Sequence, residues 1–267
     1  RVVLLDRDHL APGDSALVQF QLEAPTVALP KDRFVLRTFS PLRTIGGGPI
    51  LDARPMRHQR IAPDTLEALQ RLEGTTRDLV EQMFLKARFT PQTPHDIALA
   101  SGEGEDAVAQ ITVSLCQAGQ LTPIPPAPPT GPGRQPTEEQ YLHSRYYAAL
   151  CQLLLKTLQE HLAQNPYRLL VPVALLQSRL LKLTDRQVVE TLLRDLCGQG
   201  TIYLKGARLG LTGYEIRLAP AEEQAAERVE QLFKEAGFAP PLEEQVGQQL
   251  GLAPQAFERV MTSLIER

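Results

Sequence analysis

The sequence contains no tryptophan, and aromatic residues make up only 5% of the chain. It has three cysteines, and no two of them form a Cys-x-x-Cys pair. Scattered cysteines in odd number are typical of a reducing compartment and argue against a disulfide framework or a zinc ribbon. No apolar run approaches the roughly 18 residues that a membrane-spanning helix needs. We therefore expect a cytoplasmic protein without a membrane segment.

Catalytic motifs are also missing. The five histidines never fall into a His-Glu-x-x-His spacing, and no serine lies in a nucleophile elbow. The glycine run from Gly46 to Gly48 is followed by Pro49 and a strand-like segment. A phosphate-binding loop would instead continue into a lysine and the N-terminus of a helix. We therefore expect no catalytic residue, no cofactor-binding residue and no metal ligand, and the chain is not predicted to be an enzyme.

Positive charge is not in excess, because the formal net charge is −3. Such a chain has no global attraction to nucleic acid or to an anionic membrane. The charge is nevertheless uneven along the sequence. Basic residues outnumber acidic ones by nine to six in residues 1–60 and by eleven to seven in residues 131–219. Acidic residues outnumber basic ones by nine to four in both 61–130 and 220–267.

The first sixty residues have the pattern of β-strands. Apolar and polar residues alternate within short segments, which are separated by proline and glycine turn signals. The predicted strands are 2–5, 16–22, 34–37 and 44–51.

From residue 61 onward the apolar period is helical, and the order of helices repeats. Each repeat has a first helix, a short second helix and a third helix. In the first two repeats the third helix ends alike, at Leu115–Gly119 and Leu196–Gly200, and a strand-like segment follows. A glycine in this position adopts the left-handed cap that ends a helix. Three helices followed by a hairpin are typical of a winged-helix module.

The predicted modules occupy residues 61–130, 131–219 and 220–267. A proline-rich stretch at 123–136 is interpreted as a semi-rigid linker between the first two. The third module stops at the end of its third helix, so we expect it to be incomplete and the least stable part of the chain.

Details of the second module follow from local signals. A capping-box pattern at Thr137 predicts a long helix that reaches Gln164, where Asn165-Pro166 stops it. The short second helix is expected over 172–180. The hairpin is expected to pair 201–204 with 214–219.

The second module also has the one basic surface that could bind RNA. The third helix of the first module carries no lysine or arginine, although neutralised phosphates supply most nucleic-acid affinity. In the second module we expect contacts from Arg179, Lys182, Arg186 and Arg194 on the helices and from Lys205 and Arg208 on the wing. The alternative is that these residues form an ordinary solvated surface.

Two strings in the first block carry a family resemblance: GDSALVQFQLEAP at 13–25 and PKDRFVLRTFSPLRTIGGGPILD at 30–52. They resemble the third domain of translational GTPases of the elongation-factor-Tu type. The form with Ser40-Pro41 before Arg43-Thr44 is most similar to the selenocysteine-specific elongation factors (SelB), which append winged helices to that domain. The resemblance implies a multi-domain α+β fold, in which part of an EF-Tu domain-3-like β-barrel precedes a tandem array of winged helices.

The resemblance also implies partners. Members of the family bind GTP and Mg²⁺ through a domain that precedes these strings, deliver selenocysteinyl-tRNA to the ribosome at UGA codons, and recognise a hairpin in selenoprotein mRNA through their last module. The barrel domain lies against the tRNA stem, so Arg37 and Arg43 are candidates to contact its backbone. The alternative is that both arginines form ion pairs or pack within the barrel. We expect a monomer.

A second class of function fits the same order of elements. A winged-helix DNA-binding transcription regulator could carry a β-rich segment at its N-terminus. Such a regulator needs a basic third helix, and the first module has acidic residues there instead.

Overall fold

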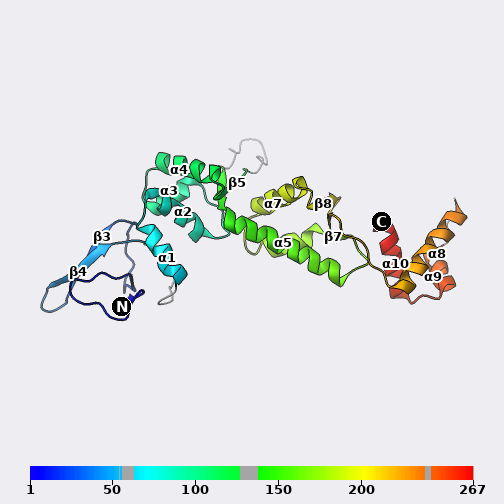
Figure 1. Cartoon of the computed structure of the whole chain (residues 1–267), viewed down its shortest axis with the longest axis horizontal. Coiled ribbons are helices and arrows are strands. Elements are labelled where there is room, and N and C mark those ends of the chain that lie inside the picture. The colour runs from blue at the N-terminus through cyan, green and yellow to red at the C-terminus, as the bar shows by residue number, and fades with distance from the viewer. Residues whose placement is uncertain (54, 56–62, 127–137, 238–241, 267) are drawn as a thin grey trace. The chain divides into compact units, whose positions relative to one another are not determined.

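The structure is a computed structural model that describes residues 1–53, 55, 63–126, 138–237 and 242–266 (Figure 1). It divides into two compact units, Arg1–Tyr146 and Tyr147–Arg267, and each is described by itself. The first unit begins with short strands and continues with helices and a small hairpin. The second contains helices and a three-stranded sheet. The fold is therefore α+β, with a β-rich region at the N-terminus.

The β-rich region consists of two antiparallel hairpins. Their strands are β1 (Val2–Leu4) with β2 (Val18–Phe20), and β3 (Arg33–Arg37) with β4 (Thr44–Pro49). The rings of Phe20 and Phe34 meet edge to face with centroids 5.1 Å apart, so the hairpins share an apolar contact. Each strand lies within one of the predicted segments or overlaps it, which confirms the β-strand prediction for this block.

The glycine run lies in β4 and has a mechanical role. A Cβ atom on Gly47 would lie 2.5 Å from the backbone oxygen of Phe34, so β3 and β4 can approach each other only if residue 47 is glycine. A Cβ atom on Gly46 would meet nothing within 4 Å. The register also shifts between Leu36 and Arg37, which leaves Ile45 as a bulge in β4.

The helices of the first unit enclose an apolar core. They are α1 (Pro63–Leu72), α2 (Thr76–Ala87), α3 (Pro94–Ser101) and α4 (Glu105–Gln117). Both α2 and α3 begin with capping boxes, which Asp78 and Asp96 complete. The buried core residues are Leu79, Val80, Met83, Phe84, Ile97, Ala98, Val108, Leu115 and Leu121. The sequence analysis gave no bounds for α1.

The hairpin after α4 corrects one prediction. It pairs β5 (Leu121–Ile124) with β6 (Gln140–His143), and α5 begins only at Ser144 (Ser144–Gln164). The long helix predicted from Thr137 is therefore wrong at its start, and Thr137 itself lies outside the described residues. As a strand, this segment buries Leu142 and forms the backbone hydrogen bonds of β5. These tertiary contacts outweigh the local helix propensity on which the prediction was based.

The predicted linker is shorter than expected at its N-terminal side. Pro123 and Ile124 belong to β5, and Ile124 is buried. The stretch 127–136 lies outside the described residues.

The second unit contains the larger part of α5 and a compact αβ arrangement. The further elements are β7 (Leu170–Pro172), α6 (Val173–Leu180), α7 (Arg186–Gly198), β8 (Ile202–Lys205) and β9 (Arg208–Leu211). The sheet has the order β7-β9-β8, and both pairings are antiparallel. The buried face of α7 consists of Val188, Val189, Thr191, Leu192, Leu193 and Leu196.

Two further corrections concern this sheet. The second strand of the hairpin is Arg208–Leu211 and not 214–219, because Gly206, with φ 63°, allows a two-residue turn directly after β8. The segment 214–219 instead returns to the end of α5, where the Tyr214 hydroxyl donates to the Leu162 carbonyl oxygen at 3.1 Å. Pro172, expected to start the short helix, ends a strand that the sequence analysis did not predict.

The last helices form a small core of their own. They are α8 (Pro220–Ala236), α9 (Glu243–Leu250) and α10 (Pro254–Glu266). Their buried apolar residues are Ala225, Ala226, Val229, Val246 and Val260. Phe257, Met261 and Leu264 are partly buried against this core.

Substitution of Gly47 by alanine should destabilise the β3–β4 hairpin. The added Cβ atom would press on the Phe34 backbone oxygen, and such overpacking costs about 1–3 kcal/mol. The matched change Gly46→Ala has open space and no left-handed φ, so it should be neutral or stabilise by about 0.4–1 kcal/mol. Hydrogen exchange of the β3 and β4 amides measures both effects. Equal protection in the two variants would contradict this account.

Candidate nucleic-acid interface

The tip of the β3–β4 hairpin carries the two arginines that the sequence analysis selected. Arg37 ends β3 and Arg43 precedes β4, and both side chains are exposed. Thr38 holds the tip together: its N–H donates to the Arg43 carbonyl oxygen at 2.9 Å, and its Oγ1 accepts from the Arg43 N–H at 3.0 Å. Within the part of the chain that the structure describes, neither guanidinium forms an ion pair.

This hairpin is a local concentration of positive charge. Residues 33–50 contain three arginines and no acidic residue, although the whole chain has a net charge of −3. The third arginine, Arg33, is also exposed. Among the described residues none of the three arginines has an acidic partner, and a cluster of exposed cations attracts a polyanionic ligand.

The second candidate surface lies in the second unit. Arg179 is in the last turn of α6 and Lys182 follows it, whereas Lys205 and Arg208 lie opposite each other across the β8–β9 turn. Arg186 and Arg194 are on α7, and all six side chains are exposed.

Three of these six cations already have acidic partners. Arg179 lies 3.7 Å from a Glu160 oxygen, Arg186 lies 2.9 Å from Glu190, and Arg208 lies 3.1 Å from Glu266. Over its own span α7 contains two arginines, one glutamate and one aspartate, so this helix is electrically neutral. A neutral helix is a poor reader of a groove, because it releases few counterions from the phosphates. This surface is therefore less suited to RNA than the hairpin tip.

The sequence analysis did not single out Glu266, which is the best-buried ion-pair partner on this surface. Only 3% of its side chain is exposed. One carboxylate oxygen accepts from the backbone N–H groups of Leu169 at 2.6 Å and Leu170 at 3.1 Å, and the other accepts from Arg208. These bonds attach the end of α10 to the start of β7. No pattern in the sequence marks the residue, because its partners lie 58 to 97 positions away.

Burial shifts the pKa values of several titratable groups in the described part of the chain. Burial raises the pKa of the Cys116 and Cys151 thiols, which makes both poor nucleophiles. Burial and a hydrogen bond to Glu139 raise the pKa of Tyr141 to about 12. Burial lowers the pKa of His143, whose Nε2 atom lies 3.6 Å from Glu81.

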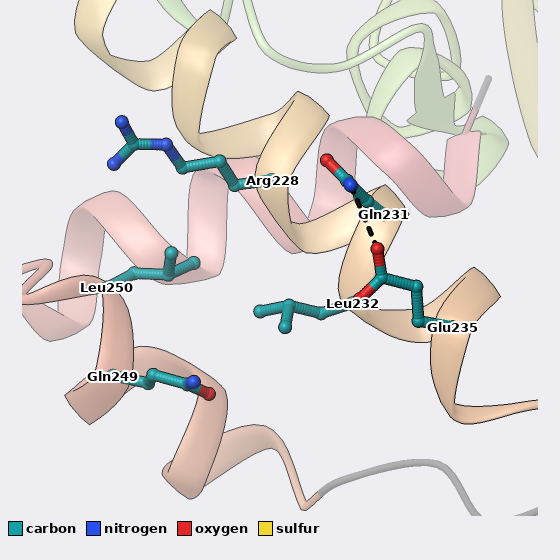
Figure 2. Close-up of a pocket in the computed structure, with 6 residues that line it drawn as sticks. All are labelled: Arg228, Gln231, Leu232, Glu235, Gln249 and Leu250. Carbon is teal, nitrogen blue, oxygen red and sulfur yellow. Dashed lines mark hydrogen bonds between the residues drawn. The ribbon is translucent and has the colours of Figure 1, made fainter.

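The hollows in the last helices are shallow. One lies between α8 and α9, where the Gln231 side-chain amide donates to Glu235 at 2.8 Å along α8 (Figure 2). The other, of about 680 Å³, lies between α8 and α10 and is lined mainly by apolar side chains such as Phe233 and Met261. In the described ranges no cluster of histidine, cysteine or carboxylate side chains has the composition of a metal site. Among the same residues, no helix is long and apolar enough to cross a membrane.

Comparison with known proteins identifies the β-rich region. Residues 1–57 match the family described as "Selenocysteine-specific elongation factor, beta-barrel domain". The N-terminal region, including the arginine-rich hairpin, is therefore similar to the β-barrel domain of a class of translation factors, the selenocysteine-specific elongation factors.

The similarity extends beyond that region. Over its full length the chain is a distant homologue of the selenocysteine-specific elongation factor of Desulfomicrobium baculatum, to which it is 24% identical over 272 residues. The alignment covers 100% of this chain and 40% of that relative, so the chain spans about 40% of the length of the curated protein it matches. The resemblance seen in the sequence is confirmed at this level.

Replacing Glu266 by glutamine should loosen the end of α10. The removal of its charge weakens the hydrogen bonds from Leu169, Leu170 and Arg208, and hydrogen bonds to a charged group contribute about 1.5–3 kcal/mol. Urea unfolding of the chain and hydrogen exchange of the Leu169 and Leu170 amides measure the effect. Glu258→Gln removes the same charge from an exposed position of α10 and should change neither; an equal effect in that control would contradict the role of Glu266.

Proposed function

We propose that this chain is the tRNA-side part of a selenocysteine-specific elongation factor, in which the β3–β4 hairpin contacts the tRNA stem and the helical modules act as a spacer. The observation that carries the proposal is the charge of residues 33–50, which have three exposed arginines and no acid and lie inside the segment that matches the SelB barrel family. GTP with Mg²⁺, the ribosome and the selenoprotein mRNA hairpin are partners of the whole factor in this proposal.

Arg37 and Arg43 are the residues that would hold the stem backbone. Both guanidinium groups can donate two parallel hydrogen bonds to phosphate oxygens, and neither has to leave an ion pair within the described chain to do so. The bonds of Thr38 keep the ends of the tip together, so binding costs little conformational entropy.

The helical modules would be winged helices. The order α5, β7, α6, α7, β8 and β9, with the sheet order β7-β9-β8, supports this assignment for residues 131–219. We extend it to residues 61–130, where the four helices α1 to α4 precede β5, whose hairpin partner β6 lies at 140–143, and to a third module at 220–267. In this assignment, residues 1–60 form the part of the EF-Tu-like β-barrel that the chain contains.

RNA contact by the second module is the weaker part of the proposal. Of its six cations, Lys182, Arg194 and Lys205 have no acidic partner among the residues that the structure describes, and they would supply a secondary, salt-sensitive contact. The neutral α7 and the absence of cations on α4 argue against a DNA-binding regulator, because both helices would lie in a groove.

The double variant Arg37→Gln/Arg43→Gln tests the proposal. Binding of selenocysteine tRNA should weaken, and the plot of log K against log salt concentration should flatten by about one unit for each phosphate that the variant no longer neutralises. Fluorescence anisotropy over a salt series measures both. The control Arg179→Gln/Arg186→Gln removes the same charge from residues already paired with glutamates and should have a smaller effect. If the control variant weakened binding more than Arg37→Gln/Arg43→Gln, the main RNA contact would lie in the second module and not in the hairpin.

A further inference from the structure

The hairpin tip presents one aromatic ring that the fold does not use. Phe39 is 101% exposed, and Leu42 beside it is 68% exposed. Every other phenylalanine in the described ranges is buried or partly buried. Phe84 is in the core, and Phe20 and Phe34 meet each other edge to face. The free energy of burying the Phe39 ring is therefore not gained within the described part of this chain.

The tip is ordered although its ring is exposed. The Thr38 hydroxyl bonds to the backbone oxygen of Pro41, and the Thr38 and Arg43 backbones bond to each other across the base of the loop. The bulge at Ile45 follows directly in β4. Phe39 thus lies on a braced loop and not on a free chain end.

The surroundings of Phe39 select the kind of partner. Arg37 and Arg43 flank the loop, Arg33 lies further along β3, and no acidic residue occurs from 33 to 50. An apolar pocket of a protein would leave these charges unmatched, whereas RNA offers phosphates for the guanidiniums and flat bases for the ring. Aromatic rings beside a cationic track are the usual means of holding unpaired nucleotides.

We propose that Phe39 stacks on an unpaired nucleobase of RNA, next to the stem whose backbone Arg37 and Arg43 hold. The inference rests on the proposed function and adds a base-stacking residue to a contact that otherwise involves only the backbone. A base inside a duplex is covered on both faces by its neighbours, so the partner base is single-stranded. Stacking requires only a π-face, so the contact tolerates any of the four bases.

The experiment compares two RNA probes on the full chain. One is a short blunt-ended RNA duplex, and the other is the same duplex with a single-stranded extension that contains 2-aminopurine. Wild-type protein should bind the extended probe more tightly and quench its fluorescence. Phe39→Ala should weaken binding of the extended probe by roughly five- to a hundredfold and abolish the quenching, while the blunt duplex should bind as before. Because the ring is exposed, the variant should unfold like wild type.

Three further variants separate stacking from other roles. Phe39→Trp should restore binding and quenching, whereas Phe39→Leu, which is apolar but not aromatic, should not. Leu42→Ala changes the neighbouring exposed apolar residue and should leave both probes unaffected. If Phe39→Leu binds like wild type, or if Phe39→Ala weakens both probes equally, the ring makes an apolar contact with the stem and base stacking is overturned.

The same measurements distinguish this inference from the proposed function. One outcome is that wild-type protein binds both probes, that Arg37→Gln/Arg43→Gln weakens binding of both, and that Phe39→Ala changes binding of neither. The backbone contact then holds, and the stacking role of Phe39 is overturned because its ring faces a partner other than RNA. If wild-type protein binds neither probe, the proposed function and the inference fall together.

Discussion

Burial of the third helix of the first two repeats against a short hairpin is the constraint on which most of the helical part of this structure depends. Helices of 8 to 13 residues such as α3, α4, α6 and α7 are too short to be stable alone. Gly119 and Gly200 therefore turn the chain, with φ of 73° and 70°, directly into strands that bury Leu121 and Ile202. The strand that pairs with β5 is β6, which lies after the proline-rich stretch in the sequence. Residues 140–143 therefore belong to the first unit, whereas most of α5 belongs to the second.

Charged residues have different roles in the helical modules and in the β3–β4 hairpin. Acidic residues cap and pair within the helical modules: Asp78 and Asp96 complete capping boxes, and Glu266 joins α10 to β7. Several arginines of those modules, among them Arg179, Arg186 and Arg208, form ion pairs with such residues. The β3–β4 hairpin has none of these partners, so its positive charge remains available although the chain as a whole is acidic. A net charge alone would have concealed this surface.

Local signals were sufficient where the interaction partner lies close in the sequence. The stop at Asn165 and the alternating segments around Phe20 and Phe34 predicted elements that the structure contains. They failed where a distant partner decides the conformation. The strand at 140–143 forms because it pairs with β5 and satisfies the backbone hydrogen bonds of that strand. The strand β9 forms at 208–211 because it pairs with β7 as well as with β8. In both cases the sheet contact outweighs the local preference.

The candidate site divides in the same way. The sequence by itself determined which residues are basic, that residues 33–50 contain no acid, and that the glycine run is not a phosphate loop, because composition and motif spacing do not depend on the fold. Only the tertiary structure decided which charges are free. Glu160, Glu190 and Glu266 pair with arginines of the second unit, Arg37 and Arg43 remain exposed, and Phe39 lies uncovered on a braced loop. Pairing and exposure are relations between residues in space, and Glu266 reaches Leu169 from 97 positions away.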